Sequence, residues 1–488
     1  TAVGYNALAA NTTGSPNTAV GHNALDACTT GGNNNALGKD ALGVLTTGSY
    51  NNAFGVSALA AATSQAASNA FGHNALDVAT DGQHNNAFGA EALGACTTGS
   101  YNCAFGGDAL GALTTASNNT AVGDDAGKAV VTGTGNTFMG ANAGAATTGS
   151  DSTAVGYNAM TANTTGINVA MGIYALDANT TGTSNTALGI NALGTNVAGD
   201  QSTAVGHEAL ATQNPSGNAD MNNTAIGYRA GYVLSTATNN NLFGAGAGDA
   251  ITTGAQNVAI GNNALGAATT TSGNIAIGNN AIDAGTDGVQ NCIGIGSDAL
   301  GALTASGGTT GTAPSIGIGY AALGAATTGT ANIAIGAWTM DAVVTGANNI
   351  AMGNGALGAL TSGASNIAIG SFAGDALTTS SDNTLIGNNA GGAIDTGASN
   401  TVMGSAAGDA LTSGHNNVYV GVNAGGTATT AGYNICIGDG AGNGGTTTGD
   451  YNIVMGNNGA GALTSGNNNV IIGQSAGDAI ADGTYNMC

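Results

Sequence analysis

The side chains that most often carry catalysis occur here as isolated residues. The five histidines are His22, His73, His84, His207 and His415. No serine–histidine–aspartate or cysteine–histidine grouping recurs in the sequence, and such a site depends on several side chains acting together. We therefore interpret the histidines as surface residues, and we expect no catalytic residues and no enzymatic activity.

Glycine-rich stretches such as 244–248 and 438–442 superficially resemble nucleotide-binding loops. A phosphate-binding loop requires Gly-Lys followed by Ser or Thr, and neither Lys39 nor Lys128 precedes a hydroxyl residue. A dinucleotide site requires a βαβ unit, which so short a repeat cannot build. We expect no bound nucleotide and no other cofactor.

Candidate metal ligands are also spread along the chain. The six cysteines contain no Cys-x-x-Cys pair and are predicted to be small buried or half-buried thiols: Cys28, Cys96, Cys103, Cys292, Cys436 and Cys488. Aspartate recurs at one repeat position, in the row Asp26, Asp77, Asp177, Asp249, Asp375, Asp409 and Asp478. The row lacks the nine-residue pattern of calcium-binding β-rolls. We predict no metal site, and calcium bound along this row is the alternative.

Recurring Thr-Thr-Gly segments, such as 12–14 and 252–254, raise the possibility of a repetitive binding surface. Aligned threonines can order water or contact a sugar, but adjacent residues on a strand point to opposite faces. Aromatic residues near the same turn are further candidate contacts: Tyr5, Tyr157, Tyr228, Tyr320 and Trp338. A glycan- or ice-binding surface on the Thr/Asn flank is therefore an alternative function.

One repeat positions all of these residues. A glycine ending a motif such as Asn-Thr-Ala-Val-Gly occurs 28 times between Gly4 and Gly473, and most of the intervals equal the step from Gly4 to Gly21. We number each repeat from this anchor glycine as zero. Helix-pair repeats need more than about 30 residues. The sequence therefore predicts an all-β parallel β-solenoid (a β-roll or β-helix) of about 28 coils, each with two or three short strands.

Alternation before the anchor glycine indicates a strand. Position −1 is always apolar, −2 is usually Ala, and −3 changes from Thr or Asn to Ile or Val near residue 250. Because −1 stays apolar, we expect it to fill the coil interior, with −3 at a coil edge or subunit contact. Position −4 is usually Asn, which can form a ladder along the stack.

Position +4 is Leu in many repeats and Gly in others. Where it is Gly, a branched apolar residue usually stands at +7, as in the repeat with Gly248 and Ile251. Gly144, Gly425 and Gly442 have no such partner. Volume lost at one core position is thus usually restored at another, as a close-packed interior requires.

Composition excludes several classes of protein. The 488 residues include 26 acidic residues, and the only basic residues are Lys39, Lys128 and Arg229, which gives a net charge of −23. Such a surface repels phosphate backbones, so we expect no nucleic-acid partner. No stretch approaches the roughly 20 consecutive apolar residues of a membrane-spanning helix. The hydrophobic residues, 42% of the chain, recur in register, which argues against disorder.

We predict one continuous solenoid domain over residues 1–488. The intervals before Gly227 and Gly319 are long, which predicts loop insertions near 211–222 and 303–314, with a subtle change of core character near 250. The sequence starts and stops within a repeat, so we expect it to be a piece of a longer protein.

The segment 17–25, Asn-Thr-Ala-Val-Gly-His-Asn-Ala-Leu, followed by Thr-Thr-Gly at 29–31, resembles the repeats of bacterial and phage tail-fibre-domain proteins. The Ala-Val/Ile-Gly strand also resembles the head repeats of trimeric autotransporter adhesins, which form a parallel β-roll. This likeness covers essentially the whole chain. It implies a trimeric fibre located outside the cell, on the cell surface or on a virion. The tail-fibre chaperone domain and the adhesin stalk and anchor are not found in this sequence.

The leading hypothesis is a structural shaft of such a fibre, which presents a binding end away from its base. A thin, alanine-lined coil with few charges is best stabilised by association, and we predict a parallel homotrimer. A cell-surface or glycan receptor would be contacted through parts of the protein that this chain does not contain.

Overall fold

The computed structural model describes residues 1–285, 289–304, 314–444 and 448–488. It contains two compact units, unit 1 (Thr1–Asn239) and unit 2 (Asn240–Cys488). Every element in the described residues is a β-strand, and none is a helix. The predicted all-β parallel β-solenoid is confirmed.

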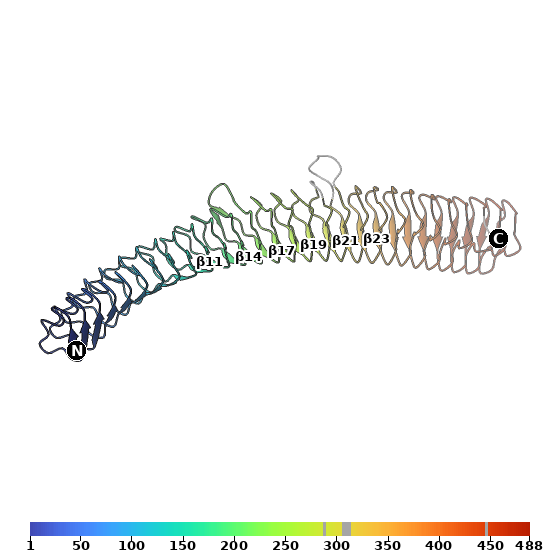
Figure 1. The fold of residues 1–488 in the computed structure, drawn as a ribbon. Helices are drawn as coiled ribbons and strands as arrows, with labels where there is room; N and C mark the ends of the chain where they lie inside the picture. The colour runs from blue at the N-terminus through green and yellow to red at the C-terminus, as the bar shows by residue number, and fades with distance from the viewer. Residues whose placement is uncertain (286–288, 305–313, 445–447) are drawn as a thin grey trace. The chain divides into compact units, whose positions relative to one another are not determined.

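Unit 1 stacks fourteen strands, one per coil, and each pairs in parallel with the strand of the next coil (Figure 1). These strands are β1 (Ala2–Val3), β2 (Asn17–Val20), β3 (Asn34–Leu37), β4 (Asn52–Phe54), β5 (Asn69–Phe71), β6 (Asn86–Phe88), β7 (Cys103–Phe105), β8 (Thr120–Val122), β9 (Thr137–Met139), β10 (Thr153–Val155), β11 (Val169–Met171), β12 (Thr186–Leu188), β14 (Thr203–Val205) and β16 (Thr224–Ile226).

Unit 2 repeats the arrangement with fourteen further strands in its described residues, again parallel and in register. They are β17 (Asn241–Phe243), β18 (Val258–Ile260), β19 (Ile275–Ile277), β20 (Ile293–Ile295), β21 (Ile316–Ile318), β22 (Ile333–Ile335), β23 (Ile350–Met352), β24 (Ile367–Ile369), β25 (Thr384–Ile386), β26 (Thr401–Met403), β27 (Val418–Val420), β28 (Ile435–Ile437), β29 (Ile453–Met455) and β30 (Val470–Ile472).

Each coil contributes one strand to the main sheet, whereas the sequence predicted two or three strands per coil. The Thr-Thr-Gly segment explains the difference, because its donors converge on one carbonyl instead of forming a ladder. The backbone N–H groups of Thr12 and Thr13 both donate to the carbonyl oxygen of Thr29, at 3.0 and 3.1 Å. The Thr12 hydroxyl donates to the same oxygen at 2.9 Å.

The anchor glycine is required by the backbone. Gly106, for example, has φ +142°, a conformation that side chains disfavour. A Cβ at this position would also collide with the carbonyl oxygen of Gly123, the anchor of the next coil. Successive coils therefore approach too closely at this corner for any residue except glycine.

Position −2, not −1, fills the coil interior, so the prediction for −1 is wrong. In β4, Ala53 is fully buried, whereas Asn52 and Phe54 on either side are half-buried and face outward. Ala58 at +3 and Leu59 at +4 complete the interior of this coil. The coil is so thin that only a methyl group fits opposite the leucine. The change at −3 near residue 250 therefore falls on the outward face.

Large residues at −2 explain the three glycines that lacked a partner in the sequence. The ring of Tyr419 occupies the space beside Gly425, where an added Cβ would lie 2.7 Å from a ring carbon. Phe138 fills the corresponding space at Gly144, and the Cys436 sulfur does so at Gly442. The volume exchange within the core thus involves −2 and +4 as well as +7.

The insertion near 211–222 is part of the folded unit 1. It contains the short strand β15 (Ala219–Asp220), which pairs in parallel with β13 (Gly199–Asp200). Met221 is buried beside this pair. Of the insertion predicted near 303–314, residues 305–313 lie outside the described residues.

Candidate interaction surface

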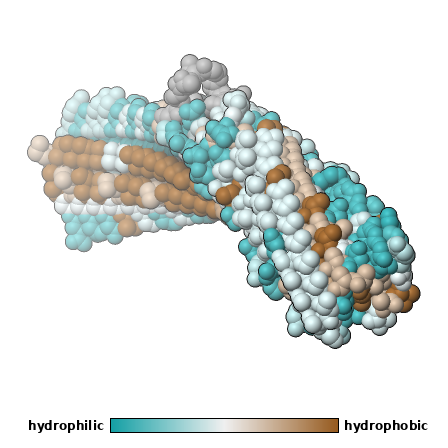
Figure 2. Space-filling view, turned by 90° about the vertical axis from the view of Figure 1, so that its left-hand side faces the viewer, coloured by the Kyte–Doolittle hydropathy of each residue, from teal (hydrophilic) through white to brown (hydrophobic). Residues whose placement is uncertain are grey.

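The strands of unit 2 present two rows of side chains outward, and we call these rows the outward strip. The strip consists of the first and third residues of β17 to β30, that is, positions −3 and −1. All of these residues are apolar except Asn241, Thr384 and Thr401. Figure 2 shows a hydrophobic band on the more distant, faded part of the molecule, which is unit 2.

The strip is continuous because the strands pair in register. Ile333 pairs with Ile350 in the next coil, and Ile350 pairs with Ile367. None of these side chains is fully buried: Ile260 exposes 40% of its surface and Ile437 exposes 37%. Single exposed apolar residues are normal, but a long file of them, unbroken at −1 in these strands, is typical of an interaction surface.

The equivalent face of unit 1 is half polar. Asn35, Asn52, Asn69 and Asn86 form a ladder at −3, in which each side-chain amide donates to the next side-chain oxygen, at 2.8, 2.6 and 2.7 Å. Beside it, Phe54, Phe71, Phe88 and Phe105 stack at −1 with ring centroids 4.7, 4.6 and 4.4 Å apart. Both ladders follow from identical residues in register, and they leave this face less apolar than the strip of unit 2.

Charge in unit 2 is wholly acidic and lies off the outward strip. Thirteen of the 26 acidic residues belong to this unit, and Lys39, Lys128 and Arg229 all belong to unit 1. Asp375 and Asp409, at +5, are half-buried, and this burial raises the pKa of both carboxyl groups. The intervening coil carries Gly392 at +5, so two like charges never adjoin here.

In unit 1 the structure gathers carboxylates that the sequence left apart. Asp77, Glu91 and Asp108 line an open surface depression of about 630 Å³. Burial raises the pKa of Asp77. At its edge, Lys128 pairs with Asp108 at 3.0 Å and with Asp125 at 2.9 Å. The depression is open to solvent, and its carboxylates could attract cations without enclosing one.

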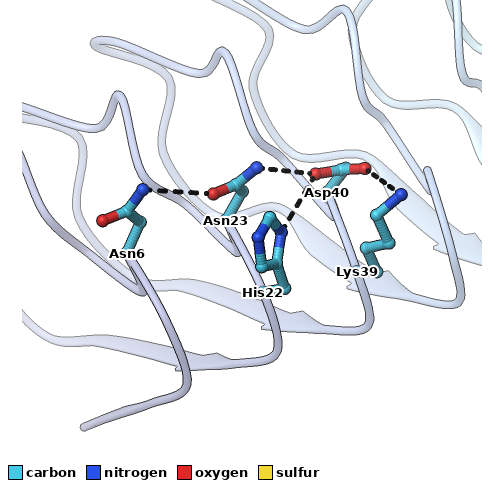
Figure 3. Close-up of polar contacts among 5 residues, drawn as sticks. All are labelled: Asn6, His22, Asn23, Lys39 and Asp40. Carbon is cyan, nitrogen blue, oxygen red and sulfur yellow. Dashed lines mark hydrogen bonds and ion pairs between the residues drawn. The ribbon is translucent and has the colours of Figure 1, made fainter.

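The polar residues after the anchor glycine form rows on the surface (Figure 3). Asn6 donates to Asn23 at 3.4 Å, and Asn23 donates to Asp40 at 3.1 Å. The amine of Lys39 and Nδ1 of His22 lie 3.4 and 4.0 Å from the Asp40 carboxylate. Such solvated pairs contribute little stability, and the group resembles a surface ladder more than a catalytic site.

Four of the five histidines pack against a tyrosine of an adjacent coil, with ring centroids 4.9 to 5.6 Å apart. The pairs are His22 with Tyr5, His84 with Tyr101, His207 with Tyr228, and His415 with Tyr433. His73 lies close to Asp77, the carboxyl group whose pKa burial raises. The structure thus places four of the histidines in separate aromatic contacts along the stack.

In many Thr-Thr segments the first threonine uses its hydroxyl hydrogen within the solenoid. Thr12, Thr29 and Thr46 donate to the carbonyl oxygens of Thr29, Thr46 and Thr63, at 2.9, 3.2 and 3.0 Å. A water lattice or a sugar would need these same donors. The second threonine of the segment, such as Thr13, remains exposed.

The cysteines are free thiols, and all except Cys488 are buried or half-buried. Burial raises the pKa of Cys96 to about 11 and that of Cys436 to about 12, which keeps both thiols protonated and unreactive at neutral pH. Within the described residues, no three His, Cys, Asp or Glu side chains come close enough together to hold a metal ion.

The sequence contained a signal for the outward strip. Position −2 is Ala in most repeats, and where it is large, as at Phe138 and Tyr419, position +4 is Gly. Two positions that exchange volume share one packed space. This exchange marks −2 as the interior position, which leaves −1 on the outward face.

In the part of the chain that the structure describes, we find no helix with the length and apolarity needed to span a membrane. No protein-family model and no curated protein matches the chain, so its resemblance to tail-fibre and autotransporter repeats stays a prediction.

Proposed function

We propose that this chain is a structural shaft of an extracellular or virion-surface fibre, assembled as a parallel homotrimer through the outward strip. The observation that carries the proposal is the strip itself, an in-register apolar file with no charged residue along the described strands of unit 2. Burying it removes apolar surface from water, which is the main driving force of association.

The size of the strip fits such a contact. Fourteen coils at about 4.8 Å each make a strip about 65 Å long. With a width of about 10 Å, it offers on the order of 650 Å², close to the roughly 800 Å² per partner of standard interfaces. The acidic residues of unit 2 lie at other positions of the coil. Copies can therefore meet along the strip without bringing like charges together at the contact.

Chain polarity favours a parallel arrangement. Position −3 is mostly polar in the strands of unit 1 and mostly Ile or Val in those of unit 2. Parallel copies in register bring apolar rows against apolar rows and the Asn and Thr rows against each other. Antiparallel copies would bury polar rows against apolar ones, which costs free energy.

The proposed role is passive. Ladder hydrogen bonds and interior side chains hold the coil, and Asn, Thr, Ser and Gly cover much of the remaining surface. A receptor would be bound by parts of the fibre that this chain does not contain, and no enzymatic activity is part of the proposal.

The first test is the mass of the chain in solution, measured by light scattering over a range of concentrations, with small-angle scattering for its shape. The proposal predicts an elongated species of three times the chain mass of 45.9 kDa. A monodisperse species at the single-chain mass would contradict the trimer, and a mass of two chains would replace it with a dimer.

A further inference from the structure

Three large aromatic side chains of unit 2 are exposed in neighbouring coils. Tyr320 follows the anchor Gly319 and exposes 51% of its surface. Trp338, the one tryptophan of the chain, stands at +2 of the next coil and exposes 50%. Phe372 stands at +2 two coils beyond Trp338 and exposes 47%.

The backbone at these positions opposes such large residues. Trp338 has φ +52° and Phe372 has φ +55°, in the left-handed region that Asn, Asp and Gly tolerate best. Other coils of this unit use such residues at +2, for example Asn263 and Asn389.

Burial in the core does not compensate for this conformation at Trp338 and Phe372. Leu357 at +4 is also left-handed, with φ +51°, but its side chain is fully buried in the core. The two aromatic rings remain half exposed. Other coils share the left-handed turn with small residues such as Ala321 and Ala406 at +2, so the feature that sets these two coils apart is a large exposed ring where a small side chain fits.

The turns hold the aromatic residues firmly. The backbone N–H of Trp338 donates to the carbonyl oxygen of Tyr320 at 2.9 Å, and that of Phe372 donates to Asn354 at 2.9 Å. The rings of Tyr320 and Trp338 meet edge to face with centroids 5.6 Å apart. Gly355 belongs to the coil between those of Trp338 and Phe372. The Phe372 ring lies so close to Gly355 that a Cβ added to this glycine would be 2.9 Å from the ring.

Polar groups accompany the rings. The Asn354 side chain is exposed and makes one long hydrogen bond, of 3.4 Å, to the carbonyl oxygen of Ala337. The Ser371 hydroxyl donates to the Asn354 carbonyl oxygen, also at 3.4 Å. Both groups retain the capacity to bind hydroxyl groups of a ligand.

We propose that Tyr320, Trp338 and Phe372 form a binding platform for a neutral oligosaccharide that extends along the coil stack. The C–H faces of pyranose rings are apolar and pack on aromatic side chains, while amide and hydroxyl groups bind the sugar hydroxyls. Trp338 and Phe372 are two coils apart, about 10 Å, which is close to the length of a disaccharide unit. Unit 2 has no Lys or Arg, so glycans with carboxylate or sulfate groups are disfavoured.

Trp338 provides a direct readout because it is the sole tryptophan. Cellohexaose, chitohexaose, laminarihexaose and maltohexaose would each be titrated into the full chain while its emission is recorded. We expect at least one of them to shift the emission saturably. Phe372→Ala and Tyr320→Ala, which keep the fluorophore, should weaken binding by on the order of tenfold. Trp338→Ala, measured by calorimetry, should weaken it at least as much.

Tyr451→Ala is the matched control, since Tyr451 is an exposed aromatic residue on another turn, 55% exposed and stacked on Tyr433. It should leave sugar binding unchanged. The proposal is overturned if no sugar of the panel changes the emission, if all variants bind as the parent does, or if the three platform variants lower the mass of the assembly instead of its sugar affinity. It does not rest on the fibre proposal, because a single chain would carry the site.

Discussion

Buried asparagine at position −4 links each coil to the next through several hydrogen bonds. The Asn366 amide donates to Oδ1 of Asn349 at 3.1 Å and to the carbonyl oxygen of Ser380 at 2.8 Å. Its own Oδ1 accepts from the backbone N–H and the side-chain amide of Asn383, at 3.0 and 3.1 Å. The ladder therefore satisfies polar groups that the narrow interior would otherwise leave unpaired.

Replacing one rung should cost more than a single hydrogen bond. Asn366→Ala removes two donors and leaves the buried backbone N–H of Asn383 without its acceptor, so we expect a destabilisation on the order of 3 kcal/mol. Hydrogen exchange by mass spectrometry should show faster exchange in the coils on either side. Asn354→Ala, on the exposed turn nearby, is the control and should leave exchange in these coils unchanged. Equal protection in both variants would mean that the ladder is not a source of stability.

The half-buried aspartates predict a pH dependence. Burial raises the folded-state pKa of Asp375, so the folded chain binds this proton more tightly than the unfolded chain. The ionised group therefore disfavours folding at neutral pH, and this effect disappears as the pH falls through the raised pKa. Asp375→Asn should raise the urea midpoint at pH 7, with a gain that shrinks towards about pH 4.

The coil of the anchor Gly438 already carries Asn443 at +5, the position of Asp375 in its own coil. Asparagine at this position therefore suits the fold. Asp382→Asn removes the same charge from an exposed corner and serves as the control. If the two variants gained equally, net charge rather than burial would be the cause.

At the scale of the coil, the interior exchanges volume between positions. The commonest combination is Ala at −2 with Leu at +4, whereas the coil of Gly421 combines Tyr419 with Gly425. Tyr419 is almost fully buried and also packs against Gly408 of the preceding coil, where an added Cβ would lie 3.1 Å from its ring. The two arrangements fill the same space.

This exchange predicts compensation between two damaging substitutions. Tyr419→Ala should destabilise the chain by about 3–5 kcal/mol through the cavity that it leaves. Gly425→Leu should also destabilise it, because the added side chain would meet the Tyr419 ring. The double variant restores the common coil pattern and should recover part of the loss. Urea unfolding of the four chains gives the coupling energy, and strictly additive effects would contradict the account.

Across the whole molecule, the repeat was enough to predict a parallel solenoid, because so short a unit with several glycines leaves few alternatives. It was not enough to predict which strand face is inside. Apolar character at −1 indicated an interior position, yet Phe54 faces outward and Ala53 faces in. Volume, not hydropathy, decided the orientation.

The platform was missed in part because Trp338 and Phe372 belong to different repeats, and only the stacking of coils brings them near each other.

Association of copies should depend on ionic strength in the direction set by the net charge of −23. Salt screens the repulsion between acidic copies and strengthens apolar contacts, so the assembly should persist to lower protein concentration at about 0.5 M NaCl than at about 0.02 M. Sedimentation velocity at both salt concentrations measures this. Dissociation on adding salt would instead indicate that ion pairs hold the copies together.

The central claim, that the outward strip is the contact between copies, is tested most directly by placing charge on it. Ile335→Asp combined with Ile369→Asp changes two outward positions and leaves the interior Ala334 and Ala368 in place. Asn354→Asp adds charge to an exposed turn off the strip. Light scattering should give the single-chain mass for the strip variant and three times that mass for the parent and the control, with the same circular dichroism for all three. An assembly of unchanged mass in the strip variant would contradict the account.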